Sequence, residues 1–257
     1  TGQTYTGGEN PNPHNGGNPV EGGTIDYDAG LQALYDLVPL DASDDNVTDD
    51  STENTDIFVR TLDSPQAVSG ALVVSTGFDS NQTADVDEAN QKLWLIDTNS
   101  QLQFWFAFPE GEVPTDPIKV GDRISFNATD LTYYGGTPEI SGLESGSFSV
   151  DSSDNDVPFT DYTGMDISLD DYLRPVRVAG VITSEGEDCG ATCFELTHGP
   201  EGSEKTVELR TNSQFIEEGD CVSFFGPLGA FPSPLADPDN ATVQLNEQNF
   251  DWLFTSQ

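Results

Sequence analysis

Two stretches of this sequence each occur twice, and together they decide the fold. Val68-Ser69-Gly70-Ala71-Leu72-Val73 returns as Val178-Ala179-Gly180-Val181-Ile182-Thr183. Downstream, Val120-Gly121-Asp122-Arg123-Ile124-Ser125-Phe126 returns as Glu218-Gly219-Asp220-Cys221-Val222-Ser223-Phe224. Both copies carry two strand-like runs between these stretches and further β-type segments after them. A repeat of this size predicts a small domain that has been duplicated.

Short alternating segments separated by Gly, Pro, Asn and Asp indicate an all-β protein. We predict a first module over residues 57–150 and a second over 159–257, joined by a linker at 151–158. The strands expected in the first module are 67–74, 92–97, 102–108, 123–131, 137–141 and 147–150. Those expected in the second are 176–183, 193–197, 206–210, 221–226, 242–245 and 250–254.

Each module has a glycine inside its first strand and a Gly-Asp turn before its fourth. Glycine within a strand marks a bulge or a sharp bend, which the coiled first strand of a small barrel needs. With about five strands per module, the pattern resembles the OB-fold and is similar to OB-type domains of secreted bacterial nucleases and bacterial surface lipoproteins. The resemblance implies two tandem five-stranded barrels whose exposed face binds oligonucleotides or oligosaccharides.

The N-terminal region has a different character. Residues 1–23 are rich in Gly, Asn and Pro, which predicts an extended arm. Within residues 24–56, Leu31, Leu34, Tyr35 and Val38 recur at helical spacing, so we expect a short helix followed by an acidic loop. Exposed strand edges of small barrels offer the arm a place to add a strand. We therefore expect self-association, as a homo-oligomer or polymer, or docking of a protein partner through the arm.

Charge narrows the range of partners. The chain has 46 acidic residues against 8 Lys and Arg, a formal net charge of −38. Such a surface repels nucleic acid, which needs cationic side chains at its phosphates, and it disfavours anionic membranes. No apolar run approaches the roughly 20 residues of a membrane span. The acidity is explained either by solvation of an exported or salt-exposed protein or by binding of divalent cations.

A candidate calcium site lies in the loop expected between the first two strands of the first module. Asp79, Asp85, Asp87 and Glu88 crowd this loop and could supply oxygen ligands for Ca²⁺. The alternative is a solvated loop without metal. No motif requires a cofactor.

Three cysteines are present, and Cys189 and Cys193 flank a tight loop that would suit a disulfide. A disulfide is typical of an exported protein. The chain begins with Thr1 rather than Met, as in a processed protein or a fragment. We expect an extracellular or cell-surface location.

The most aromatic stretch is Leu102-Gln103-Phe104-Trp105-Phe106-Ala107-Phe108. Alternation along a strand places Phe104, Phe106 and Phe108 on one face and Trp105 on the other. Either this is all core packing, or Trp105 joins Tyr133 and Tyr134 in a ligand platform. With almost no cations nearby, such a platform suits a glycan or a protein rather than nucleic acid.

The two modules differ where ligands would bind, because the corresponding strand at 205–210 has no aromatic residue. The second module instead carries an apolar loop at 224–235, which is either a partner surface or a lid over the barrel.

Catalytic signals are weak. The two histidines, His14 and His198, lie far apart in the sequence, and no hydrolase, zinc or phosphate-binding motif occurs. We predict a non-catalytic extracellular structural or assembly module. The alternatives are a glycan- or other ligand-binding OB module and the accessory region of a larger secreted nuclease.

Overall fold

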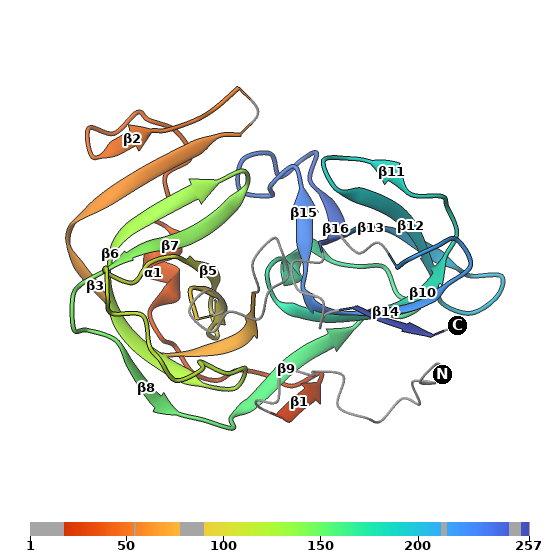
Figure 1. The fold of residues 1–257 in the computed structure, drawn as a ribbon, viewed down its shortest axis with the longest axis horizontal. Helices are drawn as coiled ribbons and strands as arrows, with labels where there is room; N and C mark the ends of the chain where they lie inside the picture. The colour runs from red at the N-terminus through yellow and green to blue at the C-terminus, as the bar shows by residue number, and fades with distance from the viewer. Residues whose placement is uncertain (1–17, 54, 78–89, 212–214, 247–252, 257) are drawn as a thin grey trace.

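The protein consists of two β modules that lie side by side (Figure 1). The computed structural model describes residues 18–53, 55–77, 90–211, 215–246 and 253–256. It is 50% strand and 4% helical, which confirms the all-β prediction.

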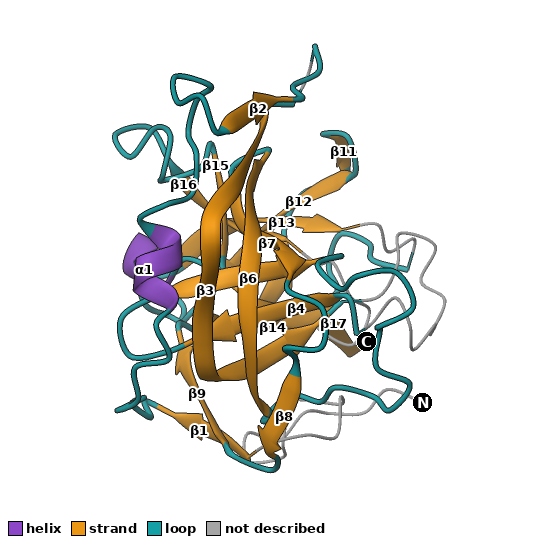
Figure 2. Ribbon diagram, turned by 90° about the vertical axis from the view of Figure 1, so that its left-hand side faces the viewer, coloured by secondary structure: helices purple, strands orange, loops and turns teal. Residues whose placement is uncertain are grey.

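The first module is a closed five-stranded barrel. Its strands are β3 (Ile57–Thr76), β4 (Lys92–Ile96), β5 (Gln101–Trp105), β6 (Arg123–Tyr134) and β7 (Thr137–Leu143). The pairing runs β3-β4-β5-β7-β6 and returns to β3, with β5 and β7 parallel and all other pairs antiparallel. This is the Greek-key barrel of the OB-fold. Two short strands, β2 (Val47–Asp49) and β8 (Ser149–Ser152), extend it along β3 and β6, the long strands of Figure 2.

The second module repeats this order in an open form. Its strands are β10 (Pro175–Ile182), β12 (Thr192–His198), β13 (Lys205–Thr211), β14 (Cys221–Pro227), β15 (Gly229–Phe231) and β16 (Thr242–Asn246). Pairing runs from β14 through β10, β12, β13 and β16 to β15, and Leu228 joins β15 back to β14. The result is a half-barrel. Three short elements complete it: β11 (Glu187–Asp188) on β12, β17 (Leu253–Ser256) on β14, and the 3₁₀ turn η1 (Leu169–Asp171).

Backbone hydrogen bonds at the Gly-Asp turns are the same in both modules. The Gly121 N–H donates to the Val73 carbonyl at 2.8 Å, and the Gly219 N–H donates to the Ile182 carbonyl at 2.8 Å. Both glycines have positive φ, +87° and +95°, the left-handed region that glycine adopts without strain. The duplication is therefore visible in the backbone as well as in the sequence.

These bonds also correct the sequence alignment of the first strands. The sequence repeat aligns Leu72 with Ile182. In the structure, however, Val73 is the equivalent of Ile182, because each accepts the N–H of the glycine in its module's Gly-Asp turn. The reason is Gly70, which has φ +71° and lies in a bulge that adds one residue to β3. Gly180 serves a different purpose, because a Cβ there would lie 2.2 Å from the Thr197 carbonyl oxygen of β12.

The N-terminal helix forms as predicted but is shorter. Helix α1 (Leu31–Tyr35) buries Leu31 and Leu34 in the core of the first barrel. The buried Asp97 carboxylate accepts the N–H groups of Ala29 and Leu31, both at 3.0 Å, and so fixes the start of the helix.

The part of the arm that the structure describes pairs within its own chain. Strand β1 (Asn18–Glu21) runs parallel to β9 (Asp156–Asp161), which in turn pairs with β10. The segment 151–158, predicted as a linker, therefore contains the end of β8 and the start of β9. The acidic stretch predicted as a loop contains β2.

The modules share a hydrophobic core. In β3 and β4, Val73 and Leu95 point into the first barrel, whereas their neighbours on the other face pack against the second module. These neighbours are Leu72, Val74, Trp94 and Ile96, and they join a cluster with residues such as Val176, Leu209 and Phe224. Strand β4 is thus buried on both faces and holds the two modules together.

Candidate functional site

A large cleft lies between the modules. Its volume is about 910 Å³, within the size range of ligand-binding pockets. Both modules line it with aromatic and polar side chains, among them Asp56, Trp94, Gln103, Trp105, Tyr133, Tyr134, Glu139, Tyr172, Glu208, Arg210, Phe231, Ser233, Gln244 and Asn246.

The first wall is the outer face of β4, β5 and β7. Gln103 of β5 pairs with Trp94 of β4 and with Glu139 of β7, so these three side chains share one face. The intervening Phe104 points into the barrel core. Strands β4 and β5 are the second and third strands of the barrel, the face on which OB-folds carry their ligands.

All three predicted platform residues line the cleft. Trp105 ends β5, Tyr133 is buried and stacks on Phe58 with ring centroids 6.2 Å apart, and Tyr134 is half exposed. The Lys92 Nζ lies 5.0 Å from the centre of the Trp105 ring. The expectation that the platform lacks nearby cations was therefore wrong, because β4 brings Lys92 beside it.

The predicted alternation of the phenylalanines was also wrong at one position. Phe104 and Phe108 are buried in the core, but Phe106 is 43% exposed and packs edge-on against Trp105. Strand β5 ends at Trp105, and Phe106 has φ +49°, so the period-two pattern stops before Phe106.

The second wall is built from the equivalent strands of the second module. The core pair Phe104 and Ile140 of β5 and β7 corresponds to the core pair Leu209 and Leu245 of β13 and β16. By this correspondence Glu208 takes the place of Gln103, Gln244 that of Glu139, and Arg210 that of Trp105. The modules thus turn equivalent faces toward one cleft.

Polar contacts fix the second wall. The Gln244 amide donates to the Glu208 carboxylate. The Arg210 guanidinium donates to Asn246 Oδ1 and to the Gly190 carbonyl, each at 3.3 Å. Arg210 and Glu208 were missed by the sequence reasoning. Their place in the duplicated strand marks them as equivalents of Trp105 and Gln103, but only packing shows that the two faces meet.

Two side chains of the first wall are deeply buried although they are polar. Gln103 is 3% exposed and Glu139 is 4% exposed. Burial raises the pKa of the Glu139 carboxyl well above its ordinary value. Burial likewise raises the pKa of Tyr172 in the cleft lining, whose hydroxyl donates to the Gly136 carbonyl at 3.1 Å.

The apolar segment 224–235 is mostly strand rather than loop. Phe224 lies in the shared core as part of β14, whereas Phe231 ends β15 and is 68% exposed at the cleft. The segment therefore forms part of the second wall.

The cysteine and calcium predictions have different outcomes. Cys189 and Cys193 are joined by a disulfide with an S–S distance of 2.09 Å, while Cys221 is free and exposed. The proposed calcium ligands Asp79, Asp85, Asp87 and Glu88 lie outside the described residues. Within the part of the chain that is described, no group of three or more His, Cys, Asp or Glu side chains could hold a metal. No helix in that part is long and apolar enough to cross a membrane.

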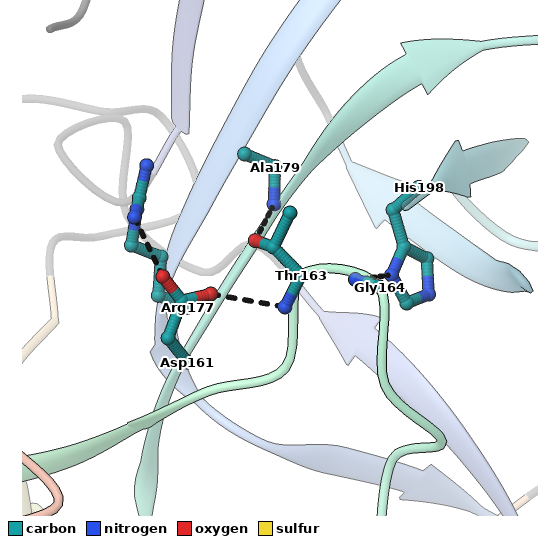
Figure 3. Close-up of polar contacts among 6 residues, drawn as sticks. All are labelled: Asp161, Thr163, Gly164, Arg177, Ala179 and His198. Atoms are coloured by element: carbon teal, nitrogen blue, oxygen red, sulfur yellow. Dashed lines mark hydrogen bonds and ion pairs between the residues drawn. The ribbon is translucent and has the colours of Figure 1, made fainter. Parts of the chain in front are cut away.

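His198 has a structural role away from the cleft. It is buried, and its Nδ1 accepts the Gly164 N–H at 3.0 Å (Figure 3). The same turn is fixed to β10 by the Asp161–Arg177 ion pair at 2.6 Å and by Thr163, whose hydroxyl accepts the Ala179 N–H. Burial, reinforced by the Lys205 charge, lowers the pKa of His198. His14 lies outside the described residues.

Comparisons with known proteins add little. No known family pattern and no curated protein match the chain. One solved structure, described as the crystal structure of the tetrameric p202 HIN2, is similar over 75% of this chain and 91% of its own, with 14% identity and a TM-score of 0.30. Because that score is low, the fold assignment depends on the strand pairing and not on this similarity.

Proposed function

We propose that the protein binds a saccharide in the cleft between its two OB modules. The observation that carries this proposal is that equivalent faces of the duplicated barrels line one cleft, with Trp105 and Tyr134 on one side and Arg210 and Gln244 on the other. Aromatic rings pack against the apolar faces of sugars, while amide, carboxyl and guanidinium groups match their hydroxyls.

Charge favours a neutral saccharide. Two carboxylates, Asp56 and Glu208, line the cleft together with Arg210, and Lys92 lies beside Trp105, so the charges at the cleft nearly balance. The net charge of −38 repels anionic ligands. Nucleic acid is disfavoured for the same reason.

We propose a binding role rather than a catalytic one, at the cell surface or outside the cell. The Cys189–Cys193 disulfide and the acidic surface are in keeping with export. His198 is buried outside the cleft lining, so it is not placed to act as a base on a ligand there.

The test is calorimetric titration with a panel of neutral oligosaccharides. We expect binding that Trp105→Ala weakens at least about tenfold, equal to about 1.4 kcal/mol. Met165→Ala removes a half-exposed apolar side chain outside the cleft lining and should bind like the wild type. Absence of binding across the panel would refute the proposal, and release of new reducing ends would refute the non-catalytic role.

Assembly through the N-terminal arm is a second candidate function. Strand β1 at the edge of its sheet shows that the arm adds a strand to β9. We propose that the arm predicted at residues 1–23 docks a second copy or a protein partner; its residues 1–17 lie outside the described residues. Light scattering should show a smaller species after deletion of residues 1–17, and an unchanged mass would contradict this role. The resemblance to secreted nucleases stays a prediction, because one fold serves many functions.

A further inference from the structure

Gln103 and Glu139 form a polar pair at the first wall of the cleft. They are neighbours in the parallel β5–β7 pair, and both line the cleft. Their side chains are 3% and 4% exposed, so what little surface they keep opens onto the cleft.

Neither side chain makes a hydrogen bond to another described residue. Their polar atoms are not among the fully buried atoms without a partner, so water or a ligand in the cleft can bond to them. A polar group left without any partner would cost about 1 to 3 kcal/mol. The equivalent pair of the second module behaves differently, since the Gln244 amide donates to Glu208. The first wall therefore presents hydrogen-bond donors and acceptors that a ligand can use, whereas Gln244 and Glu208 of the second wall bond to each other.

We propose that Gln103 and Glu139 are ligand-binding residues that hydrogen-bond two adjacent hydroxyls of a neutral pyranose ring packed against Trp105. This inference rests on the proposed saccharide-binding function. Trp105 is two residues beyond Gln103 on β5, so both side chains stand on the same face of the strand.

The chemistry of the pair suits a vicinal diol. The Gln103 amide offers N–H donors and a carbonyl acceptor, and a protonated carboxyl offers one O–H donor and an acceptor oxygen. Each sugar hydroxyl also donates and accepts. Burial raises the pKa of the Glu139 carboxyl and so favours its neutral form, because a charged carboxylate is poorly solvated there. The other titratable groups that line the cleft are Asp56, Tyr133, Tyr134, Tyr172, Glu208 and Arg210.

The test is titration of four variants with the sugar that binds the wild type most tightly. Gln103→Leu and Glu139→Leu should each weaken binding at least about tenfold, whereas Glu139→Gln keeps a neutral hydrogen-bonding group and should stay within about twofold at neutral pH. Glu201→Gln, in an exposed turn, is the matched control. The Leu variants should unfold at temperatures no lower than the wild type, because they remove a buried group without a partner.

The outcomes separate this inference from the function on which it rests. If both Leu variants bind like the wild type while Trp105→Ala loses affinity, the hydroxyl-binding pair is refuted and saccharide binding stands. If the wild type binds none of the sugars, both the hydroxyl-binding pair and the saccharide-binding function are refuted. If a Leu variant does not fold, the pH profiles decide: affinity should fall with rising pH in the wild type but not in Glu139→Gln, and identical profiles would overturn the inference.

Discussion

Ile96→Ala tests whether the two modules form one cooperative unit. Ile96 belongs to the first barrel by sequence, but its side chain is 1% exposed and packs in the core shared with the second module. The substitution removes three carbons, which costs about 2.4 kcal/mol at about 0.8 kcal/mol per buried group. The remaining cavity adds to this, so we expect a loss of about 3 to 4 kcal/mol, within the range of about 2 to 5 kcal/mol for such changes.

Native-state hydrogen exchange is the assay, because it reports each module separately. Protection of Val207 and Leu209 in β13 should fall at least about hundredfold in Ile96→Ala, although the substitution lies in the other module. Leu95→Ala is the control. Its side chain packs in the core of the first barrel, so this substitution should lower the protection of β5 whether or not the modules share a core. Unchanged protection of β13 in Ile96→Ala would refute the shared core.

Further predictions concern pH, the disulfide and salt. The raised pKa of Glu139 gives stability that is present below the ordinary value of 4.5 and lost as pH rises through the raised pKa; urea unfolding across pH should show this loss in the wild type but not in Glu139→Gln. The lowered pKa of His198 acts in the opposite sense, so its contribution is present above the ordinary value of 6.5 and lost as pH falls through the lowered pKa; His198→Gln should lack this loss in the same assay. Replacing Cys189 and Cys193 by Ser opens a loop of four-residue separation and should lower the free energy of unfolding by about 2 kcal/mol, and an unchanged denaturant midpoint would contradict this. Raising NaCl from about 0.01 M to 1 M shortens the screening length from about 30 Å to 3 Å, so the thermal midpoint of this chain of net charge −38 should rise, and a fall would contradict a self-repelling surface.

The barrel could be predicted from sequence because its signals are local. The Gly-Asp turns and the glycines of the first strands recur at corresponding places, and alternating apolar residues define most strands within a few positions. The failures also have local causes. The bulge at Gly70 shifts the alignment by one residue, and the positive φ of Phe106 ends the alternation in β5.

The site could be predicted only in part because it depends on packing between modules. Trp105, Tyr133 and Tyr134 could be singled out as a possible aromatic ligand platform, and all three line the cleft. Nothing in the sequence shows that β13 and β16 of the second module face them. In the sequence, Arg210 and Glu139 cannot be told from other strand residues. Only the packing of the two modules places them at one cleft.

Counting the saccharide sites on each chain tests the composite cleft most directly. Calorimetric titration should give one site per chain, and affinity should fall both in Trp105→Ala on the first wall and in Arg210→Ala on the second. Two equal sites per chain, or full affinity in Arg210→Ala, would show that each module binds separately and would contradict a single site built from both.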